Sequence, residues 1–167
     1  GGRISKPKGG EVMIDIMKDV TKMVQGVVLV VVGDYTEYID KLKGLFKNAD
    51  LASNVLFLGH INHNEMKYLY AISHVVVVPS LYLDPFPTIN LEAMATHRPV
   101  VGTCYGGTKE AIEDGCTGYI SDPSNIKEFS SKIIKLLNDR EEIMLFGENG
   151  YRRVKAFFSL NEQISKL

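Results

Sequence analysis

The sequence has no excess charge of one sign and no long hydrophobic run. Its 167 residues include 19 basic and 20 acidic residues, for a formal net charge of -1 at pH 7. This balance gives no field that would attract nucleic acid or an anionic membrane, so we expect neither as a direct partner of this chain. The longest apolar run, residues 27–32, is far too short to cross a bilayer. The composition is that of an ordinary globular domain.

Cysteine and histidine are also too sparse to indicate a disulfide framework or a metal centre. The two cysteines, Cys104 and Cys116, stand in turn-like stretches. They could form a bridge or a reactive thiol, but a cysteine-poor chain of this size favours plain reduced thiols. The histidines are scattered, without the spacing of metal ligands: His60, His63, His74 and His97. The sequence therefore predicts no metal site and no bound cofactor.

Short valine-rich runs recur along the chain, at residues 27–32, 55–58, 75–78 and 99–102. Because these runs do not alternate polar with apolar residues, both faces of each strand should be buried, as in parallel strands covered by helices. Apolar residues recur at helical spacing between and after the runs, at residues 12–24, 38–46, 66–70 and 126–137. This order predicts an α/β fold with a Rossmann-like, doubly wound parallel sheet and helices on both faces. Without repeats or linkers, residues 1–167 form one predicted domain.

The loops that follow the predicted strands carry the special residues. In an open parallel sheet, ligands bind at the carboxyl ends of the strands. Four of these loops carry a glycine just past the strand and the fifth carries prolines: residues 2–10, 33–36, 59–65, 79–88 and 102–108. Glycine ends strands in many α/β proteins and lets the backbone approach a ligand. Five such loops at one sheet edge favour a binding cleft.

Asp84 and Glu92 stand on either side of a predicted helix start. The stretch Asp84-Pro85-Phe86-Pro87 cannot lie inside a helix, and Thr88 is a suitable cap for the helix that follows. The backbone N–H groups of residues 88–90 would then point out unpaired, which suits a phosphate or a polar sugar. Carboxylates accept paired sugar hydroxyls well. From spacing alone, purely structural roles for the two acids are equally compatible.

Residues 79–120 closely resemble the donor-binding domain of the GT-B retaining glycosyltransferases, the large family 4 group. The matching pieces stand in the family's order: "LEAMA" at 91–95, "PVV" at 99–101, Gly106-Gly107, Glu113-Asp114-Gly115 and Thr117-Gly118. The front of the chain also agrees, with Gly2-Arg3, Lys8-Gly9 and Gly33-Asp34. No single motif identifies the family, but the motifs together cover essentially the whole chain, and as a set they are specific to it.

The resemblance implies a role for each predicted site residue. Asp84 and Glu92 correspond to the family's acidic pair, with Asp84 as the catalytic residue that contacts the donor sugar and Glu92 holding the ribose hydroxyls. Arg3 and Lys8 would grip the diphosphate, so that two cations and the helix start stabilise the leaving group without Mg²⁺. Further substrate contacts are expected at Gly33, His60, Ile61, Phe86, Pro87, Thr88 and Ile89.

The resemblance also implies the reaction and the partners. It predicts retaining, metal-independent transfer from a UDP-, GDP- or ADP-sugar to a glycan, glycolipid or polysaccharide. The family's first strand of this half and its N-terminal acceptor domain are absent from this chain and are expected upstream. We therefore expect the isolated half to be inactive alone. The expected location is cytoplasmic, with any membrane contact made through the missing half.

Three alternatives stay open at this point. A sugar-nucleotide epimerase of the same fold would differ in residues that this chain does not contain. A catalytically inactive nucleotide-binding or interaction module is compatible with two departures from the family pattern, Asp84 for the usual Glu and Pro87 for the usual Gly. A dinucleotide-binding flavodoxin-like domain would require G-x-G-x-x-G after its first strand, and residues 2–10 lack that spacing.

Overall fold

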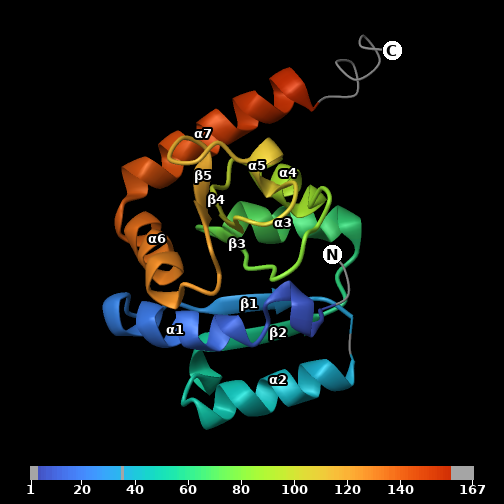
Figure 1. Ribbon diagram of the computed structural model, residues 1–167, viewed down its shortest axis with the longest axis vertical. Coiled ribbons are helices and arrows are strands. Elements are labelled where there is room, and N and C mark those ends of the chain that lie inside the picture. Colours follow the sequence, from blue (N-terminus) through green and yellow to red (C-terminus); the bar gives the residue numbers. More distant parts are fainter. Residues whose placement is uncertain (1–3, 35, 159–167) are drawn as a thin grey trace.

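The chain folds as alternating strands and helices (Figure 1). The computed structural model describes residues 4–34 and 36–158. The strands within them are β1 (Leu29–Val32), β2 (Val55–Gly59), β3 (Val76–Val78), β4 (Val100–Thr103) and β5 (Gly118–Ser121). The α-helices are α1 (Val12–Met23), α2 (Glu37–Asn48), α3 (His63–Ile72), α4 (Thr88–Ala95), α5 (Thr108–Ala111), α6 (Ile126–Asn138) and α7 (Arg140–Phe157). Two short 3₁₀ helices are η1 (Lys6–Lys8) and η2 (Ala52–Asn54).

The four strands predicted from the valine-rich runs are confirmed, with boundaries that shift by one or two residues. The helices predicted from apolar periodicity are confirmed as α1, α2, α3 and α6. Strand β5 is not among the predicted strands, because its sequence Gly-Tyr-Ile-Ser contains no apolar run. It is buried because it pairs with β4 and packs against α6 and α7.

All strand pairs are parallel, which confirms the α/β class. The strands form two sheets, one of order β1-β2 and one of order β3-β4-β5. In the second sheet Val76 pairs with Val100, and Val100 with Gly118. Parallel neighbours require crossover connections, and α2, α4 and α5 lie in these connections. Four of the loops predicted to form a cleft, at residues 33–36, 59–65, 79–88 and 102–108, therefore follow the carboxyl ends of β1 to β4.

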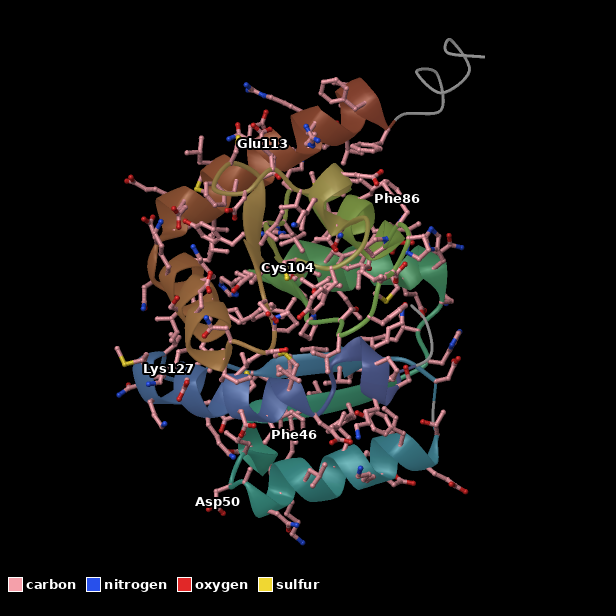
Figure 2. The ribbon with its side chains drawn as sticks, in the orientation of Figure 1. Phe46, Asp50, Phe86, Cys104, Glu113 and Lys127 are labelled. Carbon is pink, nitrogen blue, oxygen red and sulfur yellow. The ribbon has the colours of Figure 1, made fainter. Side chains whose placement is uncertain are left out.

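Helices cover both faces of the β3-β4-β5 sheet. One face of the β1–β2 pair leaves Val30, Leu56 and Leu58 exposed, so the prediction that both faces of every strand are buried is wrong for β1 and β2. One apolar cluster contains residues of α1, α2 and α6, among them Ile16, Phe46 and Phe129, packed against Val75, Val77 and Val101. Figure 2 shows Phe46 between α2 and the β1–β2 pair. The other cluster joins α3, α4 and α5 to the opposite face of the strands, through Val76, Val78 and Val100. Each fully buried large side chain contributes about 1.5–3 kcal/mol to folding.

A slot separates the two sheets. Within residues 4–34 and 36–158, β1 pairs only with β2, and β3 pairs only with β4, so each keeps one unpaired edge. Residues 27–32 and 75–78 line the same cavity, of about 1080 Å³. Figure 1 shows the β1–β2 pair and the three-stranded sheet as separate groups. We call this part of the cavity the slot between β1 and β3.

Two further sequence predictions have outcomes in the fold. Cys104 and Cys116 are both free, which agrees with reduced thiols. In the described part of the chain, no helix is long and apolar enough to cross a membrane.

Two helical glycines should respond oppositely to alanine. A Cβ on Gly44, in α2, would meet no atom within 4 Å, whereas a Cβ on Gly147, in α7, would lie 2.3 Å from the His97 carbonyl oxygen. We expect Gly44→Ala to raise the free energy of unfolding by about 0.5–1 kcal/mol, through helix propensity. Gly147→Ala should lower it by roughly 1–3 kcal/mol, because the α4–α7 contact must shift. Urea unfolding of both variants checks this, and equal shifts in one direction would contradict the packing.

Candidate functional site

One cavity brings together most of the predicted site residues. Its polar rim is formed by η1, the loop of residues 79–87 and the start of α4, and the rest of it is the slot between β1 and β3. The predicted residues that line it are Lys8, Asp84, Phe86, Pro87, Thr88, Ile89 and Glu92. The rim lies past the carboxyl end of β3, where ligands bind in parallel α/β sheets. Figure 2 shows Phe86 beside α4, close to the end of the molecule where α7 ends.

Asp84 is held by two neighbouring side chains. The Tyr82 hydroxyl donates a hydrogen bond to Asp84 Oδ2 over 2.7 Å. Lys8 Nζ lies 3.7 Å from the same oxygen and 5.6 Å from the centre of the Tyr82 ring. The Lys8 side chain is 44% exposed and that of Asp84 is 17% exposed, so the pair stands at the rim of the cavity. Such a partly exposed ion pair contributes at most about 1 kcal/mol.

The loop that carries Asp84 is fixed by a glycine turn on the neighbouring strand. The Gly107 N–H group donates to the Asp84 carbonyl oxygen over 2.8 Å. A Cβ on Gly106 would lie 2.1 Å from that oxygen, and one on Gly107 would lie 2.0 Å from the Pro85 carbonyl oxygen. Gly106 also has a φ of +62°, which side chains disfavour. The approach of these two backbones therefore requires glycine.

Segment η1 holds the same loop from the other side. The Leu81 N–H group donates to the Pro7 carbonyl oxygen over 2.7 Å. Gly9, with a φ of +80°, packs so closely that a Cβ there would lie 2.0 Å from the Pro79 carbonyl oxygen. These contacts place Lys8 beside Asp84.

The start of α4 differs from the prediction in two respects. Pro87, with φ -72° and ψ 99°, is the cap residue, so the prediction of Thr88 as the cap is wrong. The reason is that the Thr88 backbone is already helical, which directs its hydroxyl to Glu92 Oε1, 3.3 Å away. The Asn90 N–H group bonds to the Pro87 carbonyl oxygen over 3.1 Å, so the prediction of a free amide there is also wrong. Among the described residues, the amides of Thr88 and Ile89 have no partner.

The Glu92 carboxylate is held in place by a buried tyrosine. The Tyr70 hydroxyl, on α3, donates to Glu92 Oε2 over 2.9 Å. Tyr70 is only 5% exposed. Burial, and then the negative charge of Glu92, raise the pKa of Tyr70 well above its ordinary value. The phenol therefore stays protonated and donates at every physiological pH.

Three predicted residues lie at the ends of β1 and β2 and do not line the cavity. The Gly33 N–H group donates to the Gly59 carbonyl oxygen over 3.0 Å, which extends the strand pairing. His60 Nδ1 lies 2.7 Å from Asp34 Oδ1, and both side chains are exposed. Ile61 packs against the apolar cluster of α3 and α4. Arg3 lies outside the described residues.

Two tyrosines of the site are absent from the predicted set. Tyr70 is part of the apolar stripe of residues 66–70, which predicts a core residue and says nothing of its hydroxyl. The available signal is chemical, since a buried tyrosine hydroxyl usually finds a hydrogen-bond partner. The sequence position of Tyr82 does not indicate its role, because its hydrogen bond to Asp84 depends on the conformation of the loop that carries both residues.

Curated relatives cover almost the whole chain. The capsular polysaccharide biosynthesis glycosyltransferase CapM of Staphylococcus aureus is 31% identical over 160 residues, which are 95% of this chain and 41% of that protein. Spore coat protein SA of Bacillus subtilis is 27% identical over 168 residues, 94% of this chain and 43% of that protein. The chain thus spans less than half the length of these relatives.

Two solved structures of similar fold align with almost the whole of this chain. Sucrose-phosphate synthase from Thermosynechococcus elongatus has a TM-score of 0.89 and 27% identity, over 98% of this chain and 42% of that one. Anabaena HepE in complex with UDP has a TM-score of 0.87 and 26% identity, over 99% of this chain and 47% of that one. They confirm the GT-B type of α/β fold. Because the profile of the family described as "Glycosyl transferases group 1" matches residues 1–153, the chain belongs to that family.

Proposed function

We propose that this chain binds the nucleoside diphosphate of a sugar donor, as the donor-binding half of a retaining glycosyltransferase. The observation that carries the proposal is the junction of α4 with its loop. The backbone amides of Thr88 and Ile89, which have no partner among residues 4–34 and 36–158, lie one turn from the Glu92 carboxylate, and Lys8 lines the same cavity. Helix amides suit a phosphate, and a carboxylate suits paired hydroxyls. HepE, a similar structure, was solved with UDP, which supports this ligand class.

Each residue has a role in the proposal. Glu92 accepts hydrogen bonds from the ribose hydroxyls, and Asp84 contacts the donor sugar as the catalytic residue. Lys8, Arg3 and the α4 amides stabilise the negative charge that grows on the departing nucleoside diphosphate as the glycosidic bond breaks. The donor is a UDP-, GDP- or ADP-sugar. Gly33, His60 and Ile61 lie at the ends of β1 and β2 outside the cavity and would contact the part of the donor that extends beyond it, while Phe86 and Pro87 shape the cavity.

The ion pair of Lys8 with Asp84 adds a step to this account. A diphosphate that binds Lys8 competes with Asp84 for the same ammonium group. Because the pair is separated by 3.7 Å and partly exposed, separating it costs little. Donor binding would thereby release Asp84 toward the sugar, while the Tyr82 hydroxyl keeps its hydrogen bond to the carboxylate.

The relatives guide the proposal for the acceptor and the location. CapM takes part, by its name, in capsular polysaccharide biosynthesis. We propose that the complete protein likewise transfers a sugar, with retention and without a metal, to a glycan, glycolipid or polysaccharide. Transfer requires an N-terminal acceptor domain that excludes water and positions the nucleophile. The proposed location is cytoplasmic.

The slot between β1 and β3 supports the proposal that this chain is half of a larger protein. Both edges of the slot are unpaired and parallel, and exposed unpaired edges are usually covered in native proteins. Ile4 lines the cavity, and the chain then passes Pro79, at the carboxyl end of β3, where Gly9 packs against it. A segment before Ile4 that ran through the slot would therefore be parallel to β1 and β3. We propose that the preceding strand of the complete protein fills the slot.

Replacing Glu92 by glutamine should weaken nucleotide binding. The change removes the charge that strengthens the hydrogen bonds to the ribose hydroxyls, and we expect a loss of about 1.5–3 kcal/mol. Calorimetric titration of this chain with UDP, GDP and ADP, side by side, measures the loss.

The control for that experiment is Glu141→Gln, which makes the same charge change on an exposed residue of α7 outside the cavity. An unchanged dissociation constant in folded Glu92→Gln would refute the role of Glu92. If the parent chain binds none of the three nucleotides, the inactive interaction module becomes the better interpretation.

Nucleotide binding should not depend on a divalent metal. Among residues 4–34 and 36–158, no group of three or more His, Cys, Asp or Glu side chains is placed to hold a metal ion. Lys8, Arg3 and the start of α4 would supply the positive charge in its place. The titration is repeated with excess EDTA and with added Mg²⁺, and the affinities are expected to agree within error. A large loss of affinity in EDTA would show that these positive groups do not replace a metal ion.

Hydrogen exchange should reveal the strand that fills the slot. We compare this chain with the same chain extended by its natural upstream residues. The extension should slow exchange of those amides of β1 and β3 that face the slot, because they gain ladder partners. Amides of β4 between its two neighbouring strands are the internal control. A Gly/Ser extension of equal length should give no protection, and equal exchange in all three chains would rule out the strand.

A further inference from the structure

Tyr70 connects the apolar core to the rim of the cavity. Its ring belongs to the apolar cluster formed by α3, α4 and α5, while its hydroxyl reaches Glu92 Oε2 at 2.9 Å. The end of α3 that carries it is fixed, because the Tyr70 carbonyl oxygen accepts hydrogen bonds from the Ser73 hydroxyl over 2.8 Å and from the Ser73 N–H group over 3.1 Å. The phenol is thus a donor on a rigid support.

We infer that Tyr70 is a positioning residue, which orients the Glu92 carboxylate so that it can accept two vicinal hydroxyls of the bound ligand. The inference rests on the proposed function, in which those hydroxyls belong to the ribose. Tyr70 also lines the cavity, but its hydroxyl is engaged by Glu92, and in this inference it acts on the ligand through that carboxylate. Its effect passes through one oxygen of Glu92, and it leaves the other oxygen directed to the start of α4.

The two donors to Glu92 are unequal, and the difference favours Tyr70 as the residue that fixes the carboxylate. Thr88 donates to Oε1 at 3.3 Å from an exposed position, where water competes for the same oxygen. Tyr70 donates to Oε2 at 2.9 Å from a side chain that is only 5% exposed, in a part-buried hydrogen bond where water competes less. A hydrogen bond shielded from water is the stronger constraint.

Pre-orientation matters because a glutamate has three rotatable side-chain bonds. Binding a ligand to a mobile glutamate costs conformational entropy that a fixed one has already lost on folding. A vicinal diol can bond to both oxygens only when the carboxylate plane has one orientation, so an unheld carboxylate loses more for a diol than for a single hydroxyl. Tyr70 should therefore affect the preference for ribose over deoxyribose, and not only the overall affinity.

The test uses this chain and three nucleotides, UDP, GDP and ADP. The tightest binder of the parent chain is then compared with its 2′-deoxy and 3′-deoxy forms by calorimetry. We expect Tyr70→Phe to weaken binding of the ribonucleotide about three- to tenfold, the size of one lost hydrogen bond. Binding of the deoxy forms should change little, so the ratio of ribonucleotide to deoxynucleotide affinity should fall toward one.

Matched variants separate positioning from folding. Tyr68→Phe removes a hydroxyl from the exposed side of the same helix and should leave the ratio unchanged. Thr88→Val should have a smaller effect than Tyr70→Phe, since its hydrogen bond is longer. In a Glu92→Gln background, Tyr70→Phe should have almost no further effect on the ratio, because the two residues act as one unit. Thermal melting of every variant reports the structural cost separately.

Each outcome bears on a different statement. A fall in melting temperature with an unchanged ratio would mean that Tyr70 is only structural and would overturn the inference. A larger effect of Thr88→Val than of Tyr70→Phe would overturn it as well. If the parent chain binds none of the three nucleotides, the proposed function fails first and the inference falls with it. A reduced ratio in Tyr70→Phe, absent from Tyr68→Phe, supports it.

Discussion

The contact between the Gly106-Gly107 turn and the backbone of Asp84 and Pro85 is the constraint on which the candidate site depends. The two segments follow the adjacent parallel strands β3 and β4, and each glycine approaches so closely that a Cβ would lie about 2 Å from a carbonyl oxygen. Because the Asp84 carbonyl oxygen also accepts the Gly107 N–H group, the loop has little freedom to move. The position of Pro87, and hence the point where α4 begins, follows from this contact. Both the free amides and the Glu92 carboxylate take their places from that start.

The site is also continuous with the apolar core. Ala93 and Met94 follow Glu92 directly and are fully buried, and they pack in the same cluster as the Tyr70 ring. One turn of α4 therefore carries both the Glu92 carboxylate and core residues. A substitution that loosens this cluster would move Glu92 and Tyr70 together. The packing of this cluster and the geometry of the candidate site are for this reason coupled along α3 and α4, whereas the loop with Asp84 is fixed mainly by backbone contacts.

The fold could be predicted from the sequence where a local pattern determines it, and the site only in part. Valine-rich runs predicted four parallel strands, but β5 has no such run, and its place depends on pairing with β4. Family motifs indicated Asp84, Glu92 and Lys8, yet not that Lys8 and Asp84 contact each other. That contact depends on how η1 packs against the loop after β3. Thr88 is a good cap residue by type, and it fails as one because the extended backbone of Pro87 takes the cap position.

The two groups of predicted site residues belong to different sheets. Lys8, Asp84 and Glu92 surround the end of β3, whereas Gly33 and His60 follow β1 and β2. Hydrogen-bond ladders fix distances within each sheet, but none joins β1 to β3 in the described part of the chain. Neighbouring strands lie about 4.8 Å apart, so a strand in the slot would hold β1 and β3 about 10 Å apart. If the nucleotide's phosphates bind at α4 and its base at the end of β2, the filled slot sets the span between them. The structural completeness of the sheet would thereby determine which donor the site can hold.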